Sequence, residues 1–144
     1  MAKTEDRDGV DDGPDDGGPS IEALYDIVSQ VQRKLPQDIA ALARDVVVQI
    51  ENAPPGDVLS DMGIGNRLAL TGLYDGIPLT EKSASDQPLM PDIIYLFRAP
   101  IVDEWRGRGD IPLRKLVVHV YIHELAHHFG WSDDDIAEID RWWE

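Results

Sequence analysis

The most constraining feature of this chain is a long apolar-periodic stretch near its C-terminus, residues 111–129. Its apolar side chains recur at helical spacing, which predicts one long helix. Asp110 is the expected N-cap of that helix, and Pro112 is tolerated in its first turn. A chain of 144 residues is most simply one domain with a single modest core, so any functional site is built on one compact scaffold.

The predicted helix carries two histidines and a glutamate at a spacing that suits metal chemistry. His123 and His127 stand four residues apart, so both side chains leave one helix face about one turn, roughly 5 to 6 Å, from each other. Two imidazoles can then bind one ion. Glu124 is rotated by about 100° from His123, which is too far for a comfortable ligand but suits a base that reaches a water on the metal. The spacing therefore predicts His123 and His127 as metal ligands and Glu124 as the catalytic base.

A third metal ligand is expected just after this helix. Gly130 can adopt the left-handed conformation that ends a helix, and the reversed chain would carry Asp133 to the metal. The full pattern is H-E-x-x-H-x-x-G-x-x-D. By spacing alone, Asp134 or Asp135 could replace Asp133, and Glu138 is a more distant alternative. Because the chain has no cysteine, its strong ligands are histidine and carboxylate, and zinc is the metal expected for this motif.

Two further histidines on the helix are given other roles. His119 lies one turn before His123, but a straight helix places it about 12 Å from His127, so these two cannot share one ion. His119 is therefore expected in packing or in support of a ligand. His128 points about 100° away from the His127 face and is expected to be a surface or outer-shell group and not a ligand. The alternative interpretation of the whole stretch is a polar helix end with solvated histidines.

Charge restricts the partners of the protein. The chain has 13 basic and 28 acidic residues, and seven of the acids fall among residues 1–18, where the bases are Lys3 and Arg7. Residues 1–19 are predicted to be a disordered acidic tail, and residues 20–144 the folded domain. An acidic surface repels phosphate, so nucleic acid and membrane are not expected as partners. With no secretory signal and no apolar run as long as a membrane span, the protein is expected to be cytoplasmic.

The remaining patterns predict an α+β fold. Helical spacing or helix-start signals occur in residues 21–35 and 36–45, and residues 133–143 are expected to form a last helix. β-branched and aromatic runs predict three strands, residues 46–51, 68–74 and 92–99, which together make a small sheet packed against the helices. Residues 56–67 are predicted to be a loop, and their GIGNR segment lacks the glycine spacing of a phosphate-binding loop.

The stretch HELAHHFGWSDDDI resembles the motif of the minimal zincins, a family of small predicted zinc metallopeptidases. The segments VVVQIENAPP, LTGLYDGIPL and DIIYLFRAPI support the resemblance, which extends over residues 20–144 and leaves the acidic tail outside. It implies a zincin-like α+β fold with a small sheet beside the metal-bearing long helix, a zinc site and peptidase activity. Position by position, His123 and His127 match the histidine ligands, Glu124 the catalytic glutamate and Asp133 the third ligand.

The same motif also resembles that of the metzincins, which usually have a histidine where this chain has Asp133. Methionine occurs only at residues 1, 62 and 90, so the chain has no methionine turn after the motif. Support beneath the metal is therefore expected from elsewhere, for example from the last helix.

These patterns predict a zinc-dependent metallopeptidase that hydrolyses peptide bonds with a metal-activated water. Glu124 would take the proton of that water as general base and pass it to the leaving amine. The expected substrate is a peptide or unfolded protein segment that adds as a strand to the sheet edge of residues 92–99. The unranked candidates for oxyanion stabilisation are Tyr74, Tyr95, Arg98 and His128. The alternative hypothesis is a non-catalytic metal-stabilised module that binds another protein.

Overall fold

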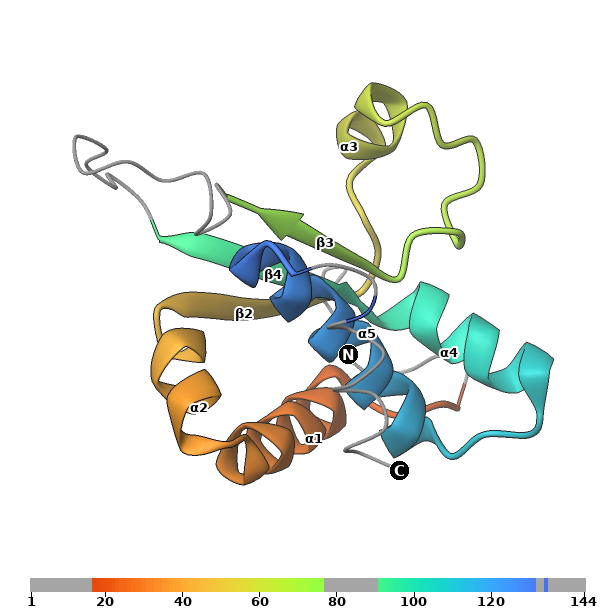
Figure 1. The fold of residues 1–144 in the computed structure, drawn as a ribbon. Helices are drawn as coiled ribbons and strands as arrows, with labels where there is room; N and C mark the ends of the chain where they lie inside the picture. The colour runs from red at the N-terminus through yellow and green to blue at the C-terminus, as the bar shows by residue number, and fades with distance from the viewer. Residues whose placement is uncertain (1–16, 77–90, 132–133, 135–144) are drawn as a thin grey trace, which may run out of the picture.

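The computed structural model describes residues 17–76, 91–131 and 134. Along this part of the chain the helices are α1 (Ile21–Lys34), α2 (Gln37–Ala43), α3 (Gly56–Asp61), α4 (Arg98–Arg108) and α5 (Leu113–Phe129). The strands are β2 (Val46–Glu51), β3 (Gly72–Asp75) and β4 (Asp92–Phe97). They form the predicted α+β fold, a three-stranded sheet against helices with a long helix near the C-terminus (Figure 1). The predicted tail, apart from residues 17–19, and the predicted last helix, apart from residue 134, lie outside the described residues.

Among the described strands the last one, β4, lies in the middle of the sheet, whose order is β2-β4-β3. β4 is parallel to β2, with Val46 opposite Asp92, and antiparallel to β3, with Gly72 opposite Leu96. Because both sides of β4 are paired, a peptide cannot add to it as a further strand. The prediction that substrate adds along residues 92–99 is therefore wrong, and the edges of the described sheet belong to β2 and β3.

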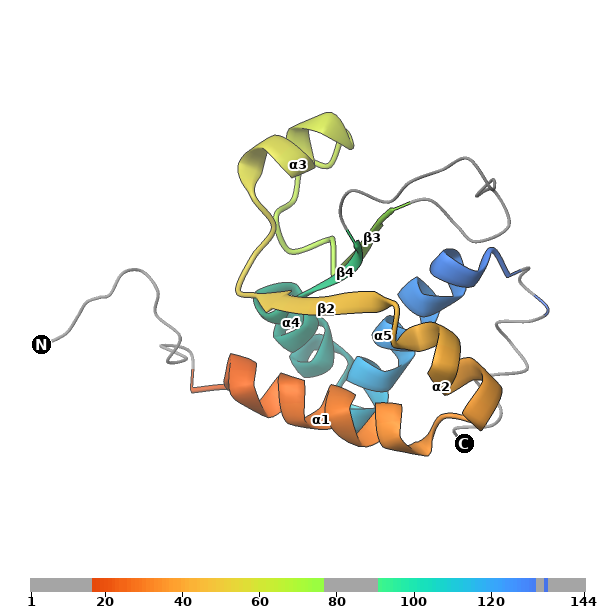
Figure 2. The ribbon, with the colours of Figure 1, turned by 90° about the vertical axis from the view of Figure 1, so that its left-hand side faces the viewer.

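The hydrophobic core lies between the sheet and the helices α1 and α5, whereas α3 lies on the other side of β2 from α1 (Figure 2). Alternate strand residues point into this core, and the buried ones are Val46, Ile50, Ile94 and Leu96. The helices contribute mainly Leu24, Val28, Val31, Leu116, Val117, Tyr121 and Leu125. Burial of such side chains stabilises the fold by roughly 25 cal/mol per Å² of apolar surface and fixes α5 against the sheet.

Neighbouring residues explain where the first helix begins and where it ends. The Ser20 hydroxyl accepts a hydrogen bond from the Ala23 N–H at 3.1 Å, which satisfies one of the unbonded donors at the start of α1. Leu35 is extended, as expected for the residue before Pro36, and the helix ends there. The helices predicted over residues 21–35 and 36–45 are confirmed as α1 and α2.

The long helix begins later than its sequence suggests. α5 starts at Leu113, with Pro112 at the N-cap position and no capping bond from a side chain. The prediction of Asp110 as the cap is wrong because Pro112 disfavours helical geometry at Ile111, the residue before it. Asp110 instead pairs with the Arg108 guanidinium at 3.5 Å.

The C-terminal end of α5 agrees with prediction. Gly130 has φ 72° and ψ 30°, and the Trp131 N–H donates to the Ala126 carbonyl at 3.0 Å. The left-handed helix end predicted at Gly130 is therefore confirmed. α5 has 17 residues, and no helix in the described part of the chain is long and apolar enough to cross a membrane.

Three segments differ from the sequence prediction. The strand predicted over residues 68–74 is shortened to β3, because the Asn66 side-chain oxygen accepts the Leu68 N–H at 3.0 Å and turns the chain. Residues 98–99, expected to end the third strand, begin α4, whose first turn tolerates Pro100. Part of the loop predicted at residues 56–67 forms the short helix α3.

Replacing Ser20 with Ala should lower the free energy of unfolding by about 1 kcal/mol, because the Ala23 N–H loses its acceptor. Urea unfolding followed by circular dichroism measures the difference. Ser29→Ala is the matched control, since Ser29 is exposed within the same helix and alanine is the better helix former there. Equal losses in both variants would mean that the Ser20 hydroxyl does not cap α1.

Candidate metal centre and active site

One face of α5 carries a row of three exposed histidines. The ring centroids of His119 and His123 lie 6.4 Å apart, and those of His123 and His127 lie 5.0 Å apart. Every other side chain of α5 in residues 116–129 is buried. The histidines therefore form a narrow polar stripe on a helix that is otherwise embedded in the core.

The rings of His123 and His127 fit two ligand positions of one zinc ion. An imidazole bound through Nε2 at about 2.1 Å places its ring centroid about 3.2 Å from the metal. At a tetrahedral angle, two such centroids are about 5.2 Å apart, close to the 5.0 Å between these rings. The Nδ1 atom of His127 lies 3.2 Å from Glu124 Oε1, which leaves the Nε2 atom to face a metal.

Glu124 is a buried acid beside this stripe, with an exposed fraction of 9%. Its carboxylate lies against His127 Nδ1 and accepts a hydrogen bond from the backbone N–H of Tyr74. Burial raises the pKa of Glu124 above its usual 4.5, and the charge of His123 and the Tyr74 N–H oppose this rise only in part. A carboxylate with a raised pKa is a stronger proton acceptor, so the arrangement suits a general base.

The backbone of β3 is oriented so that it can reach Glu124. The Phe97 N–H donates to the Thr71 carbonyl at 2.9 Å, and bonding groups alternate along an antiparallel pair. The N–H groups of Gly72 and Tyr74 therefore face away from β4. This orientation explains how the Tyr74 N–H comes to donate to Glu124.

A glycine permits the close approach of β3 to α5. A Cβ atom at Gly72 would lie 2.9 Å from Val120 Cγ1 and 3.2 Å from Glu124 Cγ. Any side chain at this position would meet Val120 first and would force Val120, Glu124 or the strand to shift. The position of the carboxylate thus depends on the absence of a side chain at residue 72.

Tyr74, Asp92 and His128 form a hydrogen-bonded cluster inside the protein. The Tyr74 hydroxyl donates to Asp92 Oδ2 at 2.7 Å, and His128 Nδ1 lies 3.1 Å from the same oxygen and 3.2 Å from that hydroxyl. The prediction of a surface position for His128 is wrong, since it is 1% exposed. On a helix with so narrow a polar stripe, a rotation of about 100° from His127 already points into the core.

Asp92 is a member of this cluster that no sequence pattern had indicated. It is 8% exposed and opens β4, where it binds both other members of the cluster. The signal that could have identified it is a carboxylate at the start of a strand that otherwise consists of apolar and aromatic residues. Buried carboxylates need hydrogen-bonding partners, so such a residue predicts a polar cluster.

Two of the candidates for oxyanion stabilisation lie away from the histidine stripe. Arg98 is buried, and its guanidinium donates to the Pro19 carbonyl and to Asn52 Oδ1 at 3.1 Å. Tyr95 follows Ile94, whose side chain points into the core, so Tyr95 lies on the face of the sheet opposite α5. The other two candidates, Tyr74 and His128, bind Asp92.

The expected third ligand falls outside the described residues. Asp133 and its alternatives Asp135 and Glu138 all lie there, and Asp134 is an exposed helical residue. Within residues 17–76, 91–131 and 134, no group of three histidines or acids is placed to hold a metal ion. Asp133 as third ligand stays a prediction from its spacing after Gly130.

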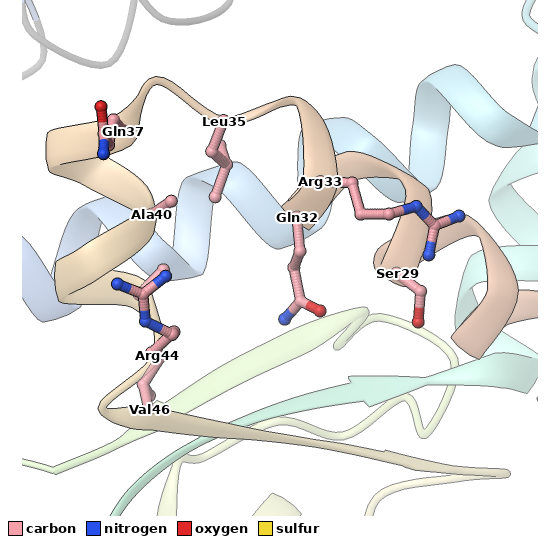
Figure 3. Close-up of a pocket in the computed structure, with 9 residues that line it drawn as sticks. Ser29, Gln32, Arg33, Leu35, Gln37, Ala40, Arg44 and Val46 are labelled. Atoms are coloured by element: carbon pink, nitrogen blue, oxygen red, sulfur yellow. The ribbon is translucent and has the colours of Figure 1, made fainter.

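A separate cavity lies between α1, α2 and the start of β2 (Figure 3). Its volume is about 670 Å³, and Gln32, Arg33 and Arg44 are among its lining residues. The two guanidinium groups point in different directions and do not converge on one anion (Figure 3). Gln32 donates to the Tyr121 hydroxyl at 3.4 Å, and Tyr121 leaves α5 about 200° around from His123. The cavity is therefore not part of the histidine stripe.

Replacing Glu124 with Gln should raise the melting temperature of the metal-free protein at neutral pH, because the amide avoids the cost of a buried charge. The pKa of Glu124 is raised on folding, so the parent loses stability as the pH rises from 4.5 through the folded-state value. The gain should therefore shrink as the pH falls toward 4.5. Thermal unfolding of both proteins with a chelator, from neutral pH down to about 4.5, measures this difference in melting temperature.

Glu22→Gln is the control for that series, because Glu22 is exposed in the first turn of α1. It should show no comparable gain. A gain in Glu124→Gln that does not change with pH would contradict a buried carboxylate with a raised pKa.

Comparison with known proteins gives one family. A family model described as zincin-like metallopeptidase matches residues 43–143. The match begins at the end of α2 and includes the sheet, α5, and the residues of the H-E-x-x-H-x-x-G-x-x-D pattern. No curated protein matches the chain.

Proposed function

The chain belongs to the zincin-like metallopeptidase family, as its resemblance to the minimal zincins indicated, and we propose that it is a zinc-dependent peptidase. The observation that carries the proposal is the position of Glu124. Its buried carboxylate lies 3.2 Å from His127 Nδ1 and accepts the Tyr74 N–H. A glutamate fixed beside two histidines of one exposed helix face is the arrangement that metal-assisted hydrolysis needs.

In this proposal His123 and His127 hold the zinc ion and Asp133 is the third protein ligand. Three protein ligands leave one position for water or substrate, whereas structural zinc sites use four. When bound, zinc supplies a Lewis acid that polarises a peptide carbonyl and lowers the pKa of water. The 5.0 Å between the two imidazole rings supports two of these ligand positions.

Glu124 transfers the protons in the proposed reaction. Its carboxylate takes a proton from the attacking water, whose oxygen forms the new bond to the peptide carbonyl carbon. The protonated carboxyl then gives this proton to the leaving nitrogen as the C–N bond breaks. Burial favours the first transfer because it raises the pKa of Glu124, and the Tyr74 N–H keeps the carboxylate oriented.

The proposed substrate is an extended peptide or an unfolded protein segment that lies along β3. This strand pairs with β4 on one side. The N–H groups of Gly72 and Tyr74 point to the other side, and Glu124 lies on that other side. Because the Tyr74 N–H is bonded to Glu124, a segment on this side pairs with the Gly72 N–H, which brings its carbonyl groups close to the base. Nucleic acid is not a proposed partner, because the chain carries a net charge of −15.

The competing function is a metal-stabilised module that binds another protein without catalysis. A structural zinc site of that kind would use four protein ligands. A glutamate with a raised pKa, held beside the histidine pair by a backbone N–H, would have no task there. The position of Glu124 therefore favours the enzyme.

The purified full chain should bind about one zinc ion per molecule, and His123→Ala should bind almost none, because only two of the proposed ligands remain. Elemental mass spectrometry of dialysed protein measures the metal content. His119→Ala is the matched control on the same helix face and should keep its zinc. Asp133→Ala should weaken zinc binding, while Asp134→Ala should not. Equal zinc content in the parent and in His123→Ala would rule out the proposed ligands.

Glu124→Gln should lower kcat for peptide hydrolysis by roughly 10²- to 10⁴-fold and leave the zinc content near the parent value, because the amide cannot accept the proton. Cleavage of a peptide library, followed by mass spectrometry, measures the change. Glu22→Gln serves as the control. Loss of zinc from Glu124→Gln would indicate a structural role, and a zinc-loaded parent that cleaves no peptide would favour the binding module.

A further inference from the structure

We propose that the Tyr74 phenol is a positioning group for Glu124: together with Asp92 and His128 it fastens β3 to the last turn of α5, and so holds the Tyr74 N–H on the Glu124 carboxylate. This inference rests on the proposed peptidase function, because it assigns a role to groups around the proposed base. None of the three side chains belongs to the proposed ligand set.

The cluster joins three elements at one carboxylate oxygen. Tyr74 comes from β3, Asp92 opens β4 and His128 lies in the last turn of α5. With the proton on His128 Nδ1, both the imidazole and the phenol donate to Asp92 Oδ2, at 3.1 and 2.7 Å. Two donors on one buried oxygen offset the cost of removing its charge from water. The carboxylate therefore ties the edge strand and the helix to the central strand.

Tyr74 belongs to this cluster and to the surroundings of the base at the same time. Its side chain leaves the same face of the sheet as Ile94, the residue opposite it, and reaches Asp92. Its backbone N–H lies along the plane of the sheet and donates to Glu124. A shift of the phenol therefore moves the peptide unit that carries this N–H.

β3 is a short strand that packs directly against α5. β3 has four residues and pairs with β4 on one side. Its approach to α5 depends on Gly72, since a Cβ there would lie 2.9 Å from Val120 Cγ1 and 3.2 Å from Glu124 Cγ. A glycine allows this close approach but has no side chain that could contact α5. The Tyr74 side chain, which bonds to Asp92 and lies 3.2 Å from His128 Nδ1 of α5, adds a directional restraint on the strand.

The simpler explanation of the cluster is that it only satisfies a buried carboxylate. Under that explanation, removal of the Tyr74 hydroxyl would lower the stability of the fold and leave the chemical step unchanged. Under the positioning role, it would also loosen the Glu124 carboxylate. The two explanations differ in their effect on Glu124, so stability alone does not separate them.

Tyr74→Phe removes the hydroxyl and keeps the ring. This variant should retain its zinc and a KM within about threefold of the parent, while kcat falls about tenfold or more, because the base samples more orientations. Tyr25→Phe is the matched control, since the Tyr25 hydroxyl accepts the Ile50 N–H at 2.9 Å between α1 and β2. It should lower stability and leave kcat unchanged. Asp92→Asn, which keeps an oxygen acceptor for the phenol, should lie between the parent and Tyr74→Phe in kcat.

A second measurement does not depend on activity. In ¹⁵N-labelled protein the amide resonance of residue 74 reports its hydrogen bond to Glu124, because Glu124→Gln replaces a charged acceptor with a neutral one. This substitution should shift the resonance in the parent background. In the Tyr74→Phe background the shift should be much smaller, because the N–H is no longer held on the side chain of residue 124.

The positioning role would be overturned by an unchanged kcat in folded, zinc-loaded Tyr74→Phe, or by an equal amide shift in both backgrounds. If the zinc-loaded parent cleaves no peptide, the amide comparison decides the positioning role by itself, and only the peptidase proposal fails.

Discussion

The close approach of β3 to α5 is the constraint on which the rest of this site depends. Glycine at residue 72 leaves space for the Glu124 side chain, and the neighbouring peptide unit donates its N–H to the carboxylate. The same proximity buries the acid and raises its pKa. On the other side of α5, Tyr121 and Leu125 lie in the core and hold the helix against the sheet. Protein packing thus sets the environment of the base.

Helices and strands that are marked by residues close together in the sequence could be predicted. The run VVVQIE forms the predicted strand, because β-branched residues favour extended structure and the prolines that follow end it. Ser20 and Pro36 mark the two ends of α1, and Gly130 ends α5. The common face of His123 and His127 follows from helix geometry alone, because a separation of four residues is about one turn. Each of these inferences needs only residues that are close in the chain.

Features that depend on pairing between distant segments were not predictable. The pattern of DIIYLFRA predicts a strand but not that the strand lies in the centre of the sheet. That position depends on β2 and β3, which come from earlier in the chain. The burial of His128 depends on Asp92, which lies 36 residues earlier. Glu124 was identified from its motif, whereas the Tyr74 N–H that orients it comes from a strand that the motif does not mention. Asp110 failed as a cap because Pro112 acts on the residue between them.

The strand order also affects how the chain can fold during synthesis. β2 and β3 emerge from the ribosome before β4, the strand with which both pair, so neither can join this sheet at first. α5 follows later still, and its contacts with β3 close a loop of roughly fifty residues, which is slow compared with local pairing. An N-terminal fragment that stops before α5 lacks both the base and the helix against which β3 packs. A nascent chain therefore has no assembled site until α5 has been made.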